Sequence, residues 1–182
     1  SDKDNVEQFA WQTSWGVSWR LIGAMIMVHG DDKGLVLPPK VAPIQVVIVP
    51  IYKSDEAKEI VFPKLNEIRE QLESNKIRVY VDDRNELTPG YKFNDWELKG
   101  VPLRIEIGPK DIEKQQIILA KRYNREKISL GFREIEKIVT ILDEIQNDML
   151  KIAKAKAKEN TINISDYSEF KSKIGKGGFF NA

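Results

Sequence analysis

Ile44-Gln45-Val46-Val47-Ile48-Val49 is the stretch of this 182-residue chain that decides the fold. All of its residues except the glutamine are apolar and β-branched. A nearly continuous run of this kind is typical of a strand that is buried on both faces. Such a strand needs a covering layer on each side, so the run indicates a sheet with helices on its faces.

The chain after this run alternates between helix and strand patterns. Ser54, which two acidic residues follow, is typical of a helix N-cap, and Pro63 is expected to kink or restart that helix. Thr88 and Pro89 predict the start of a shorter helix that ends near Gly100. Further strands are expected at residues 77–81, 103–107 and 115–121 and near 128, with a long helix from 132.

The strand predicted after the shorter helix alternates between apolar and charged residues. Leu103, Ile105 and Ile107 are expected to face the core, and Arg104 and Glu106 to face the other side of the sheet. The apolar side of the first helix is expected to consist of Ile60, Val61, Ile68 and Leu72. The whole order of elements implies an α/β fold.

Composition excludes several classes of protein. With 41% hydrophobic and 31% charged residues, the chain has a soluble globular composition rather than a disordered one. It has no cysteine, which excludes a disulfide framework and a thiolate zinc site. The longest apolar run, Leu21 to Val28, is shorter than the ~20 residues of a membrane span, and no signal-peptide pattern is present, so we expect a cytoplasmic protein with no membrane association.

The formal net charge of +1 is low for a protein that binds nucleic acid. Nucleic-acid-binding domains usually carry a strong basic excess, because much of their affinity comes from phosphate contacts. Any RNA site on this chain is therefore expected to be a local patch rather than a whole face.

The segment before the first strand combines residue types that suit a nucleotide phosphate. Gly16 allows close approach of the backbone to a ligand, and Ser14 and Ser18 offer short hydrogen-bonding side chains. Arg20 begins an apolar helical run and can pair with an anion from a buried helix. A structural ion pair is the alternative for this arginine.

Two blocks of sequence resemble a known family. Segments 12–16, 20–24 and 29–39 resemble motif 3 of class II aminoacyl-tRNA synthetases. Their residues are most similar to those of the prolyl-tRNA synthetase family. Segments 88–102 and 108–111 are similar to the anticodon-binding domain of that family, in its archaeal and eukaryotic-like type. The resemblance implies a C-terminal piece of a longer enzyme, because motifs 1 and 2 precede these blocks in the family.

The resemblance also implies the fold and its division. The expected fold is α/β, the class II aminoacyl-tRNA synthetase anticodon-binding fold, with a mixed five-stranded sheet and three flanking helices. A motif 3 remnant of the catalytic domain and a linker are expected at 1–43, the anticodon-binding domain at 44–145, and the end of the long helix with the beginning of a C-terminal domain at 146–182.

The function implied is that of a parent enzyme, a proline–tRNA ligase and homodimer, which activates proline with ATP and Mg²⁺ and attaches it to tRNA(Pro). This chain would supply anticodon recognition and the motif 3 contacts, and it is expected to be inactive alone because motif 2 is missing. The alternative is a freestanding RNA- or protein-binding module derived from the same fold, without catalytic activity. The motif 3 remnant counts against that alternative.

Motif 3 assigns roles to several residues by resemblance. Arg20 would be the catalytic residue and hold the γ-phosphate of ATP, which Ser18 would also contact. The proline site would be formed by Trp15, Gly16 and Ser14. Position 19, often threonine in the family, is Trp19 here.

Proline anticodons share guanines at the second and third positions, and guanine edges suit paired acidic and basic side chains. A glutamate can accept from N1 and N2, while lysine or arginine donates to O6 or N7. The anticodon contacts are therefore expected at Glu106, Lys110, Arg104 and Arg122, with Lys110 presented beside Glu106 by a tight turn. A surface ion pair of Glu106 with Arg104 or Lys110 is the alternative. Phe93 and Trp96 either stack on bases or pack in the core.

Three other features have plainer interpretations. His29, the only histidine, is expected to be a helix-dipole partner or core contact rather than a catalytic base. Asp31 and Asp32 are expected to lie in a solvated turn rather than to bind a metal. The lysines within 151–158 either bind the tRNA backbone or form a solvated helix end.

Overall fold

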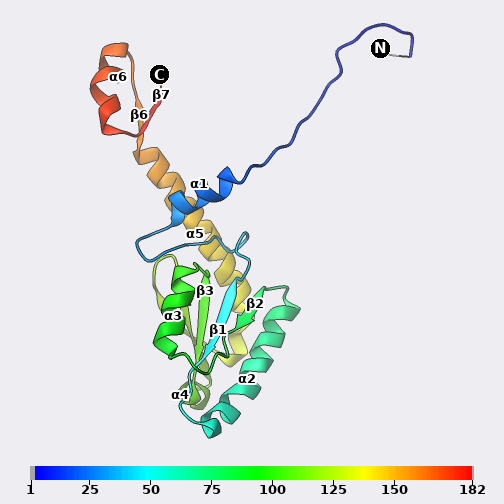
Figure 1. Ribbon diagram of the computed structural model, residues 1–182, viewed down its shortest axis with the longest axis vertical. Helices are drawn as coiled ribbons and strands as arrows, with labels where there is room; N and C mark the ends of the chain where they lie inside the picture. Colours follow the sequence, from blue (N-terminus) through cyan, green and yellow to red (C-terminus); the bar gives the residue numbers. More distant parts are fainter. Residues whose placement is uncertain (1–2, 182) are drawn as a thin grey trace.

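A mixed five-stranded sheet forms the centre of the structure, a computed structural model in which residues 3–181 are described (Figure 1). Its strands are β1 (Val46–Pro50), β2 (Val79–Val81), β3 (Leu103–Ile107), β4 (Gln116–Lys121) and β5 (Lys127–Gly131), in the order β2-β1-β3-β4-β5. Strands β2 and β3 pair with β1 in parallel, whereas β4 and β5 are added antiparallel. The expected mixed five-stranded sheet is confirmed.

Three long helices flank this sheet, as expected. They are α2 (Asp55–Ser74), α3 (Pro89–Leu98) and α5 (Lys137–Glu159). A short helix α4 (Pro109–Glu113) follows β3, and a 3₁₀ turn η1 (Phe132–Glu134) precedes α5. Helix α3 covers one face of the sheet, while α2 and α5 contribute to the hydrophobic cluster on the other face.

Strand β1 is buried on both faces, as its β-branched residues predict. Val46 and Ile48 pack into the cluster with α2 and α5, whereas Val47 and Val49 pack with Trp96 of α3. The predicted alternation in β3 is also present, because its leucine and isoleucines are fully buried on the α2 and α5 face. Its two charged residues therefore lie on the α3 face.

Helix α2 continues through its proline, contrary to the expected kink or restart. Ser54 caps it, accepting a hydrogen bond from the Ala57 amide (3.3 Å). Buried residues on both sides of Pro63 hold the two halves against the sheet, which offsets the hydrogen bond that a proline cannot donate. These buried residues are Val61, Leu65, Ile68 and Leu72. Ile60 falls outside this stripe and is 55% exposed, so its expected burial is wrong.

Two outer parts are attached to the sheet domain. Helix α1 (Arg20–His29) contacts α5, and the residues before it extend away from the rest of the molecule (Figure 1). At the far end of α5 lies a small unit of β6 (Thr161–Asn163), α6 (Tyr167–Lys173), a 3₁₀ turn η2 (Ile174–Lys176) and β7 (Phe179–Asn181). The carboxylate of Asp166 accepts from the Glu169 amide (2.9 Å) and so caps the start of α6.

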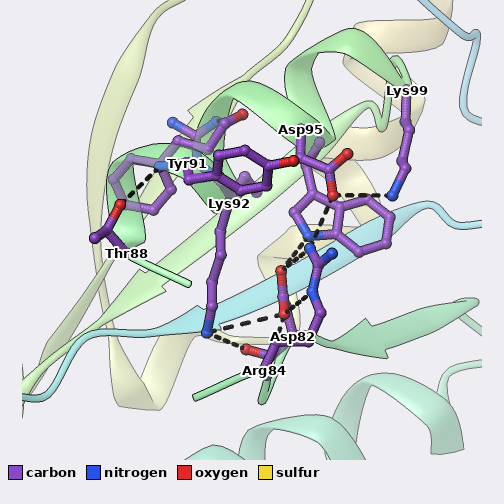
Figure 2. A network of polar contacts seen from close by, with 10 residues as sticks. Asp82, Arg84, Thr88, Tyr91, Lys92, Asp95 and Lys99 are labelled. Carbon is purple, nitrogen blue, oxygen red and sulfur yellow. Dashed lines mark hydrogen bonds and ion pairs between the residues drawn. The ribbon is translucent and has the colours of Figure 1, made fainter. Parts of the chain in front are cut away.

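A buried carboxylate joins α3 to the end of β2 (Figure 2). Asp82 is fully buried and accepts two hydrogen bonds from the Arg84 guanidinium (2.8 and 2.7 Å) and one from the Trp96 indole (2.7 Å). The buried ammonium of Lys92 donates to the Asp82 carbonyl (3.0 Å), and Arg84 also reaches Asp95 of α3 (2.8 Å). These contacts fix the position of α3 on the sheet.

The same contacts decide the charge state of Asp82. Burial by itself raises its pKa, but the hydrogen bonds from Arg84 and Trp96 outweigh burial and bring the pKa down to about 2. The ordinary value is 3.8. A carboxyl group with a depressed pKa stabilises the fold above its unfolded pKa, and this stabilisation is lost as the pH falls through the folded value.

We expect Asp82→Asn to lower the free energy of unfolding by about 3 kcal/mol at pH 7, because it breaks a buried ion network. Wild type should lose about 2 kcal/mol through the Asp82 carboxyl between pH 4 and pH 2, and the variant should lose correspondingly less. Urea unfolding at several pH values measures both effects. The control is Asp83→Asn at the neighbouring exposed residue, and equal stability of the two variants would contradict the stabilising role of Asp82.

Candidate nucleic-acid interface

A cavity of about 220 Å³ lies beside α3 at the end of the sheet where β3 begins. We call it the basic pocket. Its lining includes six cationic residues and one acidic residue, Glu97. The cationic residues are Lys33, Arg104, Lys121, Arg122, Arg125 and Lys127, and the remaining lining consists of Val47, Trp96, Val101 and Ala120.

The floor of the pocket is a row of residues across three strands. Arg104 of β3 lies opposite Ala120 of β4, which in turn lies opposite Lys127 of β5. All three side chains point to the same face, because directly opposed residues of paired strands do so. The small alanine leaves room between two long cationic side chains, which explains why a cavity forms at this point.

Glu106 lies beneath this row and holds its two cations. Its carboxylate accepts from the Arg104 guanidinium (2.8 and 3.1 Å) and from the Lys127 ammonium (2.9 Å). The Arg104 guanidinium also lies over the Phe93 ring, 4.3 Å from its centroid. Glu106 is only 6% exposed and does not line the pocket, so the ion-pair alternative for Glu106 and Arg104 describes the contacts present.

Arg122 forms a wall of the pocket rather than a free contact. Its buried guanidinium donates to both carboxylate oxygens of Asp31 (2.9 and 2.6 Å) and to the carbonyl of Glu97 (2.9 Å). The hydrogen bond from Arg122 is the main reason that the pKa of Asp31 lies well below its usual range. Asp31 is thus ion-paired, which corrects the expectation of a merely solvated turn.

Lys110 makes no ion pair with Glu106 within residues 3–181 and lies on α4 rather than at the pocket. Gly108 and Pro109 lead into helix α4, with the Gly108 amide donating to the Asp111 carboxylate (2.9 Å). Helix α4 contacts α2 and β4 beyond the carboxyl end of β3, whereas the pocket opens at the amino end of that strand. Among residues 3–181, the ion pairs of Glu106 are with Arg104 and Lys127.

The aromatic side chains of α3 are mostly packed against the sheet and neighbouring side chains rather than exposed to solvent. Trp96 is 5% exposed in the cluster with Val47 and Val49, although one edge lines the pocket. Phe93 is half-buried beneath Arg104 and Lys127. Core packing is therefore the main role of both rings in this structure.

The motif 3 residues are exposed and do not enclose a ligand site by themselves. Ser14, Trp15, Gly16 and Ser18 lie in a stretch without helix or strand, and Arg20 is the exposed first residue of α1. Helix α1 has no buried residue, which contradicts the expected buried helix. The physical reason is that α5 is its main packing neighbour within the described residues, which leaves most of its apolar side uncovered.

The remaining candidates are unremarkable in chemistry. Partial burial lowers the pKa of His29 at the end of α1. The lysines within 151–158 are exposed on α5, and Lys151 pairs with Asp148 (3.4 Å). No cluster of three His, Asp or Glu side chains within residues 3–181 could hold a metal ion, and no helix there is long and apolar enough to cross a membrane.

Comparison with known proteins agrees with this geometry. Residues 45–142 match the family model described as an anticodon-binding domain. The chain belongs to this anticodon-binding domain family. The resemblance to prolyl-tRNA synthetases predicted from the motifs is confirmed by curated and structural relatives.

The relatives match almost the whole chain. The proline–tRNA ligase of Chloroflexus aurantiacus is 47% identical over 181 residues, and that of Cenarchaeum symbiosum is 50% identical over 184 residues, covering 97% and 100% of this chain. The crystal structure of prolyl-tRNA synthetase from Cryptosporidium parvum, complexed with L-proline and AMP, matches 98% of the chain with 42% identity and a TM-score of 0.88. The chain spans 38% of the length of each of these proteins.

Sequence reasoning missed part of the pocket of this anticodon-binding domain. It named Arg104 and Arg122 but not Lys33, Glu97, Arg125 or Lys127. A usable signal was present, because segment 121–127 is rich in basic residues and links two predicted strands. Lys33 and Glu97 carried no such signal, since only the folded chain brings them to the hairpin.

The turn that contains Asp31 packs directly against the end of α3, and a glycine in the turn makes this close contact possible. Gly34 has φ +128°, and a Cβ there would lie 2.6 Å from the Leu98 carbonyl oxygen. The Leu35 amide donates to that same carbonyl (3.0 Å), so the turn and the helix end are in direct backbone contact. Only glycine combines this backbone conformation with so close an approach.

We expect Gly34→Ala to destabilise the chain by about 2 kcal/mol, through a left-handed backbone strain and a clash with helix α3. Gly90→Ala is the matched control, because Gly90 lies in the first turn of α3 with open space where a Cβ would go. That change should stabilise the chain by about 0.5–1 kcal/mol. Thermal unfolding measures both, and equal shifts would show that the turn is not seated as described.

Proposed function

We propose that the basic pocket binds the anticodon of tRNA(Pro), as part of a prolyl-tRNA synthetase that activates proline with ATP and Mg²⁺ and attaches it to that tRNA. The observation that carries the proposal is a cavity lined by six cationic residues and the acidic side chain of Glu97. RNA is recognised with sequence specificity mainly at unstacked bases, and a cavity of mixed charge suits such a base better than a flat surface.

The chemistry of the lining fits guanine. The Glu97 carboxylate can accept from the N1 and N2 hydrogens, while Arg104 and Lys127 can donate to O6 and N7. Both cations already have a fixed orientation, because Glu106 holds them from beneath. Pre-oriented donors lose less entropy on binding than free side chains do.

The proposal keeps one of the four sequence-predicted contacts and changes the roles of the other three. Arg104 stays as a base contact, and Arg122 becomes a wall whose hydrogen bonds are already used. Glu106 becomes an orienting carboxylate, and its expected role as acceptor passes to Glu97. Lys110 is replaced by Lys127, because Lys110 lies on α4 at the other end of β3.

The acidic contact can be tested with a matched pair of variants. Glu97→Gln should weaken binding of a proline anticodon stem-loop by about 1–3 kcal/mol and reduce its preference over a loop with adenine at the second or third position. Glu113→Gln on α4 makes the same chemical change at an exposed position away from the pocket and should bind as wild type. Fluorescence anisotropy titrations measure both, and a wild-type preference in Glu97→Gln would contradict the proposal.

The basic contacts separate the pocket from the site expected from sequence. Lys127→Ala should weaken binding of the proline stem-loop about tenfold or more, because it removes a charge-assisted donor. Lys110→Ala should leave the affinity within about twofold of wild type, as expected for an exposed charge remote from the RNA. A larger loss of affinity in Lys110→Ala than in Lys127→Ala would contradict the proposal and place the RNA contact at the carboxyl end of β3.

We further propose the motif 3 roles for the segment before the domain. Arg20 and Ser18 would contact ATP, and Trp15, Gly16 and Ser14 would shape the proline site once the rest of the parent enzyme covers them. The chain by itself is then inactive, and the parent acts as a cytoplasmic homodimer. The domain boundaries within this chain lie after residues 43 and 145. The freestanding-module alternative is less well supported, because the relatives match across the residues before 45 as well.

In the full-length parent we expect Arg20→Ala to raise the barrier to proline activation by about 2–4 kcal/mol, through loss of a preorganised charge next to phosphate. Proline-dependent pyrophosphate exchange measures the effect. Arg69→Ala, an exposed arginine on α2, is the control and should exchange normally. Near-normal exchange in Arg20→Ala would show that this arginine has a structural role.

A further inference from the structure

Arg125 lies at the mouth of the basic pocket between two carboxylates. It sits in the hairpin between β4 and β5 with φ 61°, a left-handed conformation that few residues other than glycine adopt. Its guanidinium donates to Asp31 (3.2 Å) and approaches the carboxylate of Glu97 to 4.0 Å. The side chain is 56% exposed, so it is free to move toward either acid.

Hydrogen bonds within its turn fix the position of the Asp31 carboxylate. Asp31 and Gly34 exchange two backbone hydrogen bonds (3.1 Å each), and the Lys33 amide donates to the Asp31 carboxylate (2.9 Å). The turn is seated on the end of α3 through the Leu35 amide. The carboxylate is therefore a fixed anchor that comes from outside the five-stranded sheet.

Arg122 and Arg125 both pair with Asp31, but their side chains differ in how freely they can move. Arg122 is buried and is also fixed by the Glu97 carbonyl, so it stays in place whatever Arg125 does. Arg125 has no second fixed partner at hydrogen-bond distance among the contacts described for it. Without Asp31, the nearest acid left for its guanidinium is Glu97.

We propose that Asp31 is a positioning residue that determines base specificity by holding Arg125 away from Glu97. The proposal rests on the proposed anticodon function of the pocket. With Asp31 in place, the Glu97 carboxylate keeps a face for the N1 and N2 hydrogens of guanine. When Asp31 is lost, Arg125 closes on Glu97, pairs with that carboxylate and competes with the base.

Removing Asp31 then changes two quantities in opposite directions. Specific binding falls, because the acceptor for guanine is occupied by Arg125. Binding that depends only on phosphate stays equal or rises, because a negative charge next to the pocket is removed. A purely structural role would instead weaken all RNA ligands alike.

The test compares Asp31→Asn with Asp32→Asn in the 182-residue chain. Asp32 is the next residue of the same turn and has no hydrogen bond or ion pair within residues 3–181, so its variant makes the same charge change without releasing an arginine. Each is titrated with proline anticodon stem-loops carrying guanine or adenine at the second and third positions. We expect the preference for guanine to fall about tenfold in Asp31→Asn, with unchanged or tighter binding of the adenine loop, and to stay as wild type in Asp32→Asn.

A double-mutant cycle shows whether Asp31 acts through Arg125. In an Arg125→Ala background, no guanidinium is left to cover Glu97, so adding Asp31→Asn should leave the preference unchanged within about twofold. An equal loss of preference in both backgrounds would overturn the proposal. Equal weakening of both loops by Asp31→Asn would overturn it too, because that is the result of a structural role.

Thermal unfolding shows whether Asp31→Asn is folded, since it removes a partner of buried Arg122. If it is unfolded, Asp31→Glu replaces it, because this variant keeps the charge and shifts the anchor of Arg125 by one methylene. The preference for guanine should then fall by about threefold, on the order of half the free-energy change of a tenfold loss. A wild-type preference in that variant would overturn the proposal. Should wild type itself show no preference for guanine, the proposed function fails and this inference falls with it.

Discussion

Burial of β1 on both faces is the constraint on which the rest of the structure depends. Its alternate valines and isoleucine join two separate clusters, one with α2 and α5 and one with α3. The second cluster is small, comprising four buried residues: Val47, Val49, Trp96 and Val101. A small cluster leaves α3 in need of polar attachment, which Asp82 provides at Lys92 and Trp96 and the turn at Gly34 provides at the carboxyl end of the helix. The face that carries the pocket is therefore held by ion pairs as much as by apolar contact.

The same polar attachment explains how a chain of net charge +1 can contain a strongly basic cavity. Apart from Glu97, which Arg125 approaches at 4.0 Å, the acids that pair with the pocket cations lie outside the lining. Glu106 is beneath Arg104 and Lys127, Asp31 is behind Arg122 and Arg125, and Glu126 pairs with Lys121 at 2.7 Å. Charges that nearly cancel over the molecule are thus separated locally, with cations inward and carboxylates outward. This matches the expectation of a local patch.

The fold could be predicted from sequence because its signals are local. The run at β1, the caps at Ser54 and Thr88 and the alternation in β3 each depend on neighbouring residues, and all three are present in the structure. Pro63 misled the prediction, because buried residues on either side outweigh a local helix breaker.

The site was predicted less well because it is assembled from residues far apart in the chain. Asp31 and Arg122 are 91 positions apart, and no periodicity or capping pattern connects them. Glu106 has the residue type and the face expected of a base-reading acid, but a sequence does not reveal that two cations already occupy its oxygens. Glu97 differs from Glu106 because, within residues 3–181, its carboxylate accepts no hydrogen bond and Arg125 approaches it only to 4.0 Å. The chemical identity of a side chain therefore sets what it could recognise, while its ion-pair partners decide whether it is available to do so.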